Sequence, residues 1–462
     1  MKKSNILLSE NEENKICKVF KDKTTFENVT IFYKIAAFYK LQNLFNGFLC
    51  YIERFFTVVA ETENFLKLNF AFVSKILSSS SLHITSELEV LKAAEDWLSY
   101  NFEERKSFAS DLLLKVRLCL LSENSLKCLL LKSSTFRKDE RCVKTIQKVL
   151  QEESKCNLRN LAARYRCCEQ SMFNTLVCGG SSDNVYEISG RKITNETHMT
   201  SSRTYFKAVY LKGEVFIFYG NGDSKYLTSV EKYSILTKTW QCVADDDKSY
   251  NKFCACGIVD KIYICGGRER DTNKRIDWMA RRRQYYPENT VRVFDTKDYS
   301  FKQVAKMKFN KSYAACSAYQ GKVVVSGGYS YGRYLSVVEA YDQTSDKWVE
   351  MPSLIIPRSQ HCQVSVRSKL FIIGSFNESC EMLDSDNQRF VFIKKPAKSQ
   401  LSYSRSFEAV SIGNKIVAYD FHVQKYSSYD VEKNEWSEED FELTKHLAGF
   451  ACVKIPQFMT CQ

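Results

Sequence analysis

Residues 230–240 read VEKYSILTKTW, and the same pattern returns in VEAYDQTSDKW at residues 338–348 and in YDVEKNEW at residues 429–436. In each stretch a tyrosine is followed seven residues later by a tryptophan, with polar residues between them. Aromatic and β-branched runs on either side of a polar turn are typical of a β-hairpin. The spacing occurs six times with large apolar residues at both ends: Tyr186 and Ile193, Tyr233 and Trp240, Phe294 and Phe301, Tyr341 and Trp348, Leu383 and Phe390, and Tyr429 and Trp436. The sequence therefore contains six copies of one hairpin-bearing unit.

Each unit also carries short strand-like runs, several of which end in glycine. They read TLVCGG, EVFIFYGNG, KIYICGG, KVVVSGG, KLFIIGS and KIVAYDF. Units of roughly 40 to 60 residues with four short strands are the signature of a β-propeller, in which radial stacking buries the faces of the small sheets. We expect six blades over residues 172–462. The first unit lacks an opening strand, so we expect HLAGFACVKI near the end of the chain to complete blade one.

The N-terminal third has a different period. Between residues 28 and 150 the apolar residues recur at helical spacing, as in NVTIFYKIAAFYKLQNLFNGFLCYIERFF and TSELEVLKAAEDWLSYNF. We predict a short N-terminal segment over residues 1–27, a helical domain over 28–153, a linker over 154–171 and the propeller over 172–462. The fold class is multidomain, α followed by all-β.

Composition excludes several classes of protein. The 462 residues are 44% hydrophobic and 26% charged, and no signal peptide or run of about 20 apolar residues is visible, so we expect a cytoplasmic protein without a membrane segment. The 18 cysteines are dispersed within apolar runs and are interpreted as buried free thiols. Five scattered histidines and the lack of a nucleophile or phosphate-loop motif predict no metal, no cofactor and no enzymatic activity.

The chain resembles the BTB-BACK-kelch family in two independent regions. Double glycines at 179–180, 266–267 and 327–328, followed by the Tyr and Trp pairs, resemble kelch repeats. TENFLKL, SSSLHITSELEVLKAAEDWLSYNFEER and LLLKVRLCLLS resemble the BACK domain. Units two, five and six depart from the double glycine, and the roughly 28 residues before the first helical pair leave no room for a complete BTB domain.

This resemblance implies a non-catalytic substrate-recognition adaptor of the cullin-3 ubiquitin ligase type, in which the propeller captures the protein to be ubiquitinated. In the family, the BTB domain and the following helical pair bind cullin-3, so the apparent loss of the BTB domain weakens that expectation. The alternatives are an actin-binding or other cytoskeletal scaffold, and a decoy that binds substrate without cullin.

A basic residue stands before the innermost strand of each unit. These residues are Arg203, Lys252, Lys311, Arg358, Arg405 and Lys445. Repetition around a closed ring would bring six cations to one face, where they could hold an acidic partner. The alternative is that each cation bonds nearby carbonyls as part of the repeat. Neighbouring aromatic residues, Tyr205, Phe253, Tyr313 and Phe407, are candidates for contact with a partner or for the core.

A second candidate site is an insertion in the third unit, RERDTNKRIDWMARRRQYYPENT. It carries Arg268, Arg270, Arg281, Arg282 and Arg283 beside aromatic residues. With a net charge of +13, the chain favours an acidic protein partner; nucleic acid is the less favoured partner because no nucleic-acid motif accompanies the charge. The insertion could equally be a solvated loop.

Overall fold

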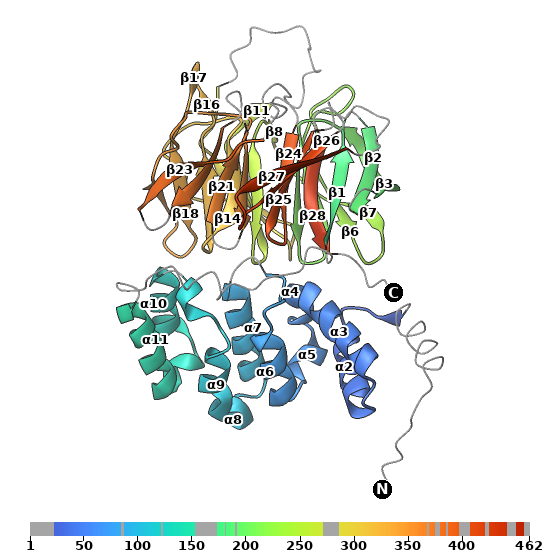
Figure 1. Cartoon of the computed structure of the whole chain (residues 1–462), viewed down its shortest axis with the longest axis vertical. Helices are drawn as coiled ribbons and strands as arrows, with labels where there is room; N and C mark the ends of the chain where they lie inside the picture. The colour runs from blue at the N-terminus through green and yellow to red at the C-terminus, as the bar shows by residue number, and fades with distance from the viewer. Residues whose placement is uncertain are drawn as a thin grey trace. The chain divides into compact units, whose positions relative to one another are not determined.

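The computed structural model describes residues 23–456 with the exception of 85–86, 122, 153–172, 181, 190–191, 271–285, 367–368, 375–378, 385–386, 397–406, 421–424 and 441–449. The chain divides into two compact units, one helical and one built of β-sheets (Figure 1). A helical region followed by a six-bladed propeller confirms the predicted fold class.

The helical unit consists of short helices that pack around one core. Its α-helices are α2 (Val29–Phe38), α3 (Gln42–Arg54), α4 (Phe56–Val59), α5 (Glu63–Leu66), α6 (Phe70–Ser78), α7 (Glu87–Tyr100), α8 (Phe102–Arg105), α9 (Ala109–Leu113), α10 (Glu123–Lys132) and α11 (Glu140–Glu152). Asn69 begins α6 by accepting a hydrogen bond from the backbone N–H of Phe72 at 3.1 Å. Among the helices described, none is long and apolar enough to cross a membrane.

Trp97 of α7 is the largest side chain of this core. It is 1% exposed, and its indole N–H donates to the carbonyl of Leu68 at 2.8 Å. The guanidinium of Arg105 lies 4.1 Å from the indole ring and donates to the Trp97 carbonyl. One aromatic side chain thus joins α7 to the segment that follows α5 and to α8, satisfying its polar atom while burying its rings.

The β unit contains six four-stranded antiparallel sheets, which are the blades (Figure 1). Blade one comprises β28 (Phe450–Pro456), β1 (Phe173–Gly179), β2 (Ser182–Ser189) and β3 (Lys192–Arg203), and blade two β4 (Lys207–Leu211), β5 (Glu214–Phe218), β6 (Ser229–Ser234) and β7 (Thr239–Asp245). Blade three comprises β9 (Cys254–Ile258), β10 (Lys261–Cys265), β12 (Val291–Asp295) and β13 (Phe301–Gln303), and blade four β14 (Ala315–Tyr319), β15 (Lys322–Ser326), β18 (Val338–Asp342) and β19 (Lys347–Met351). Blade five comprises β20 (Cys362–Val366), β21 (Lys369–Ile373), β22 (Cys380–Asp384) and β23 (Arg389–Ile393), and blade six β24 (Phe407–Ile412), β25 (Lys415–Asp420), β26 (Lys425–Asp430) and β27 (Glu435–Asp440).

The spaced apolar pairs lie where the hairpin prediction places them in five blades. Tyr233 is directly opposite Trp240, and the equivalent partners face each other in blades three to six. Blade one differs, because a bulge shifts the register and Tyr186 lies opposite Asn195 instead of Ile193. Cross-strand pairs of large side chains are the local unit of sheet stabilisation, so the spacing predicts the hairpin wherever no bulge intervenes.

The hairpin turn also connects neighbouring blades. In blade four, Asp346 has a positive φ of 49° and accepts hydrogen bonds from the Tyr341 hydroxyl at 2.7 Å and from the Ala305 N–H at 3.0 Å. The Trp348 indole N–H donates to the Ala305 carbonyl at 2.8 Å. Because Ala305 follows the last strand of blade three, this hairpin fixes the chain that leaves the preceding blade. Blade six repeats the arrangement with Tyr429, Asn434 and Trp436.

The ring closes by combining strands from both ends of the β unit. The last strand, β28, pairs with β1, which confirms that the end of the chain completes blade one. Across this blade, Lys207 of blade two and Glu408 of blade six form an ion pair at 2.5 Å. Thr175 of blade one also bonds the Tyr419 hydroxyl of blade six at 2.9 Å. Closure therefore depends on β28 together with contacts between the blades that flank it.

We expect a chain that ends at residue 449 to lose much of the propeller's stability. The deletion removes the partner of β1 and exposes an edge, and Phe450, Val453 and Ile455 are each at most 5% exposed. Burial of one such side chain contributes roughly 1.5–3 kcal/mol. Thermal unfolding followed by circular dichroism would measure the change. A chain that ends at residue 456 keeps β28 and is the matched control; equal unfolding midpoints for the two would contradict this account of closure.

Candidate functional site

Arg203 is buried beneath the loops of blade two. Its guanidinium pairs with Glu231 at 2.5 Å, and both side chains are 0% exposed. It also donates to the Tyr219 carbonyl at 2.9 Å and to the carbonyl and hydroxyl of Ser229. The second oxygen of Glu231 accepts the N–H of Thr200 at 2.8 Å. The carboxylate thus fixes the segment that enters blade two through both a side chain and a backbone group.

Two further blades repeat this arrangement. Arg358 pairs with Glu381 and donates to the carbonyls of Gly374 and Ser379, at 2.9 and 2.6 Å. Lys311 lies 2.7 Å from Glu339, and both are 0% exposed. As with Glu231, each of these carboxylates accepts the N–H of the residue three positions before its cation. Glu381 accepts from Ile355, and Glu339 accepts from Lys308. Cation, carboxylate and backbone donor therefore form a unit that recurs in blades two, four and five.

The burial of Arg203, Lys311 and Arg358 corrects the expectation that they are exposed on a partner-binding face. A guanidinium that is already surrounded by protein acceptors cannot also hold a partner's carboxylate. The alternative considered from the sequence, that these cations bond nearby carbonyls, describes Arg203 and Arg358, whereas Lys311 is held by its ion pair with Glu339. Arg405 and Lys445 lie outside the described residues.

Lys252 does not occupy the position of these buried cations. In blades two, four and five, a residue with positive φ follows two positions after the cation: Tyr205, Tyr313 and Gln360. In blade three the positive-φ residue is Lys252 itself, with φ of 60°. The place of the cation is taken by Tyr250, which is 4% exposed. Aligning the units by their nearest basic residue was therefore wrong by two positions in blade three.

The carboxylate of this unit is also replaced in blade three. Arg292 on β12 stands two residues before Phe294, where the other blades carry Glu231, Glu339 or Glu381 before their own anchors. Arg292 pairs with Asp246, which also accepts a hydrogen bond from the Tyr219 hydroxyl. Burial, aided by the hydrogen bond with Asp247, raises the pKa of Asp246 to about 6, whereas the hydrogen bond from Tyr219 and the positive charge of Arg292 lower it. Blade three thus holds the same kind of interior ion pair with its charges exchanged.

The positive-φ residues are linked from blade to blade. The N–H of Tyr313 donates to the Lys252 carbonyl at 2.8 Å, and the N–H of Gln360 donates to the Tyr313 carbonyl at 2.9 Å. Their side chains are half-buried, and that of Tyr205 is 45% exposed. In contrast, Phe253 and Phe407 are buried in the cores of their blades. Of the four aromatic residues named from the sequence, Tyr205 and Tyr313 thus occupy positive-φ positions with accessible side chains, whereas Phe253 and Phe407 belong to the core.

The blade-three insertion is described only at its two ends. Arg268 is half-buried on β11 (Arg268–Arg270), which pairs with β8 (Ser249–Asn251). Its guanidinium lies 5.8 Å from the Tyr313 ring. Arg270 pairs with Ser249 through the backbone. Arg281, Arg282 and Arg283 lie outside the described residues.

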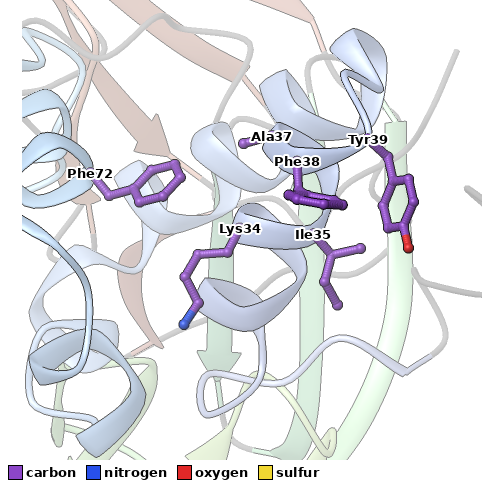
Figure 2. Close-up of a pocket in the computed structure, with 6 residues that line it drawn as sticks. All are labelled: Lys34, Ile35, Ala37, Phe38, Tyr39 and Phe72. Carbon is purple, nitrogen blue, oxygen red and sulfur yellow. The ribbon is translucent and has the colours of Figure 1, made fainter. Parts of the chain in front are cut away.

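The helical unit presents an apolar surface on α2. Ile31, Ile35 and Phe38 are 36%, 37% and 77% exposed, and their spacing of four and three residues gives one stripe. Figure 2 shows Ile35, Phe38 and Tyr39 beside an open pocket of about 460 Å³, with Lys34 at its edge. Periodicity alone could not identify this surface, because it does not reveal which apolar positions lack a neighbouring element.

Most of the other side chains that could take part in catalysis or metal binding are buried or half-buried. The imidazole of His361 is 6% exposed, and its Nε2 lies 2.8 Å from the Ser326 hydroxyl. Within the described part of the chain, His, Cys, Asp and Glu residues form no cluster of three that could hold a metal ion. The cysteines described are free thiols, and all except Cys242 are buried or half-buried.

Comparisons with known proteins identify both units. The BACK (BTB And C-terminal Kelch) family model matches residues 29–130, and the Kelch motif model matches residues 202–246 and 311–355. Kelch-like protein 7 from Rattus norvegicus is 25% identical over 335 residues, which cover 71% of this chain and 55% of that protein. Kelch-like protein 36 from Bos taurus is 23% identical over 82% of this chain and 64% of its own. Kelch repeat and BTB domain-containing protein 3 from Mus musculus is 23% identical over 73% of this chain and 50% of its own. The chain thus spans about half to two thirds of the length of these relatives.

Replacing Arg358 with Ala should destabilise the propeller strongly. The substitution leaves Glu381 buried without its cation, which typically costs about 3–5 kcal/mol. Arg333, which is exposed on the neighbouring blade, gives the matched control Arg333→Ala. Chemical denaturation of the two variants and the parent chain would measure the difference. Equal stability of the two variants would refute a structural role for the buried cation.

The His361 imidazole should make the propeller less stable in acid. Burial, together with the charges of Arg358 and Lys311, lowers the pKa of His361 to about 3, whereas an unfolded histidine titrates near 6.5. The unfolded state therefore takes up a proton that the folded state does not as pH falls from about 6.5 to 3, and stability is lost over that range. Measured unfolding free energies should depend less on pH in His361→Gln. A pH dependence equal to that of the exposed-histidine control His198→Gln would contradict this assignment.

Proposed function

We propose, starting from the fact that this chain belongs to the BTB-BACK-kelch family, that it is a substrate-recognition adaptor of a cullin-3 ubiquitin ligase. The family relationship makes the chain a protein-interaction module. In this proposal residues 172–462 capture a protein substrate and residues 28–153 attach the chain to the ligase. Catalysis then comes from the ligase, and the chain contributes proximity between enzyme and substrate.

The apolar surface of α2 is the observation that carries the proposal. Phe38 leaves 77% of its side chain exposed, beside Ile35 and Tyr39 (Figure 2). Exposed contiguous apolar residues are costly in water and commonly mark protein-binding surfaces. The surface lies in the first helical pair, α2 and α3, which is the segment that the family resemblance assigns to cullin binding.

The propeller is suited to the complementary task. Its crossing segments are fixed by buried ion pairs, so the loops that they carry start from rigid positions. Loops on a rigid scaffold can present side chains to a partner with little loss of entropy on binding. A rigid recognition unit joined to a docking unit is the arrangement that an adaptor requires.

We expect the full chain to bind the purified N-terminal region of cullin-3, and Phe38→Asp together with Ile35→Asp to weaken this binding at least roughly ten-fold, because a buried charge replaces apolar contact. Isothermal titration calorimetry would measure the affinities. Leu114→Asp with Leu131→Asp is the matched control, since these leucines are 67% and 71% exposed on other parts of the helical unit.

Failure of the full chain to bind cullin-3 would overturn the ligase proposal. The two alternatives would then be distinguished by further measurements on the same chain. Co-sedimentation with actin filaments would indicate a cytoskeletal scaffold, whereas capture of a partner without cullin-3 or actin would indicate a substrate-binding decoy.

A further inference from the structure

Four cysteines gather between blades three and four. Cys254 and Cys256 lie on β9, Cys265 lies on β10, and Cys316 lies on β14. The first three belong to the apolar core between these blades, and Cys316 packs against that core. All four are free thiols. Contact among several thiols allows chemistry that a single buried thiol does not have, because one sulfur can attack another.

Cys254 and Cys265 are direct cross-strand neighbours. The register of β9 and β10 places them opposite each other, so both side chains lie on the same face of the blade. The Cys254 sulfur lies 3.7 Å from the Cys265 carbonyl oxygen. Residues that face each other in an antiparallel pair have Cα atoms about 4.5–5.5 Å apart, within the range of about 4.4–6.8 Å that a disulfide spans. The two cysteines can therefore be joined while the strands stay paired.

Cys254 ionises more readily than its two neighbours. Hydrogen bonds from the thiols of Cys265 and Cys316 lower the pKa of Cys254, although burial opposes them. The positive charges of Lys207 and Lys311 act in the same direction as the hydrogen bonds. The bond with Cys254, together with burial, raises the pKa of Cys265, and burial raises that of Cys316. A thiolate beside thiols that keep their protons is the arrangement of a nucleophile with a resolving partner.

Covalent chemistry between thiols suits this cluster better than metal coordination. A structural zinc site requires four ligands that converge on one point. Within the part of the chain that the structure describes, no three His, Cys, Asp or Glu side chains converge in this way. A disulfide requires only two sulfur atoms at facing positions, which Cys254 and Cys265 provide.

We propose that Cys254 and Cys265 form a redox-sensitive pair, which hydrogen peroxide converts into a cross-strand disulfide and a dithiol reductant restores. Cys254 is the nucleophile, Cys265 is the resolving thiol, and Cys316 is a positioning residue that donates a hydrogen bond to the Cys254 sulfur. The disulfide ties the start of β9 to the end of β10, between the crossing segment and the insertion of blade three. It stabilises the blade under oxidising conditions.

The reaction proceeds in two balanced steps. The Cys254 thiolate attacks one oxygen of hydrogen peroxide, a sulfur–oxygen bond forms and the oxygen–oxygen bond breaks; the departing hydroxide takes up the proton that the thiol released and becomes water. The Cys265 sulfur then attacks the sulfur of the Cys254 sulfenic acid. The sulfur–oxygen bond breaks, and the hydroxide leaves with the Cys265 proton as a second water. Two thiols are oxidised to one disulfide, and one peroxide is reduced to two waters.

Burial makes the pair selective for a small oxidant. Cys254 is 3% exposed and Cys265 is 1% exposed, so a bulky oxidant such as oxidised glutathione cannot reach them in the folded blade. Hydrogen peroxide is close to water in size and enters through local openings of the structure. The half-buried Cys316 is the most accessible of the four cysteines and marks the side from which the oxidant arrives.

Disulfide mapping of the full, folded chain tests the pair directly. After treatment with hydrogen peroxide, the remaining thiols are blocked with N-ethylmaleimide in denaturant, and the chain is digested with trypsin without reduction. Cleavage after Lys252, Lys261 and Arg268 places the two cysteines on separate peptides, FCACGIVDK and IYICGGR. We expect mass spectrometry to find these peptides linked through Cys254. The link should disappear after treatment with dithiothreitol, and the unfolding midpoint should rise on oxidation and fall back on reduction.

Substitutions separate the three roles. Cys265→Ala removes the resolving thiol, so the Cys254 sulfenic acid should persist and react with dimedone. Cys316→Ala removes a hydrogen bond to Cys254 and should slow formation of the link several-fold, whereas Cys316→Ser keeps a donor and should restore most of the rate. Cys362→Ala is the matched control, because Cys362 is a buried thiol of blade five whose pKa is raised by burial. Its substitution should leave the rate unchanged.

Three results would overturn the inference. The two peptides could be linked only after the chain is unfolded, or not at all. Cys254 could be joined to Cys316 in place of Cys265, which would remove the assigned resolving thiol. Finally, Cys362 could be oxidised at as low a concentration of peroxide as Cys254, which would show that contact among thiols confers no reactivity. The first and third results are obtained on the parent chain and do not depend on whether a variant folds.

Discussion

The propeller depends on a carboxylate buried on the third strand of a blade. Glu231, Glu339 and Glu381 each hold a cation and a backbone N–H from the segment that crosses between blades. Removing two charges from water is costly, and the cost is offset only where every polar atom finds a partner. The terminal nitrogens of the two arginines find such partners in additional carbonyl and hydroxyl acceptors on the adjoining strands, whereas Nε of Arg203 has none. The ion pair therefore fixes the path of the segment that crosses between blades. The surface loops joined to that segment are positioned by it.

Blade three shows the structural effect of replacing that carboxylate. Arg292 takes its place, Asp246 supplies the negative charge from the preceding crossing segment, and Tyr250 fills the position of the cation. The nearest lysine, Lys252, then falls on the positive-φ position, with its ammonium over the Tyr313 ring of the next blade. The basic residue of blade three thus lies at the positive-φ position, half-buried, and not among the buried cations of the repeat.

The sequence predicts the hairpins well because their information is local. Tyr341 and Trp348 face each other because their spacing of seven residues spans one hairpin turn, and the same spacing makes the pair recognisable in the sequence. Blade one is the exception, because its bulge shifts the register. The prediction of a ring of exposed cations was wrong for Arg203, Lys311 and Arg358. The sequence does not show whether a basic residue that precedes a strand is buried or exposed. The missing signal was the glutamate two residues before the aromatic anchor, present in VEKY and VEAY and replaced by arginine in VRVF. Exposure of Phe38 on α2 could not be predicted, since helical periodicity marks an apolar face without showing what covers it.

The positive-φ residues show how one backbone conformation can carry different side chains. A residue with a side chain in this conformation costs about 1–2 kcal/mol, and for Lys252, Tyr313 and Gln360 the cost is offset by hydrogen bonds between the same positions of successive blades. Because those bonds use only backbone atoms, they place no demand on the side chain. The position accordingly holds Tyr205, Lys252, Tyr313 and Gln360 without a change in the loop path. The loop path is thus set by the buried interior pairs and by the backbone, so the side chain at the positive-φ position can differ from blade to blade.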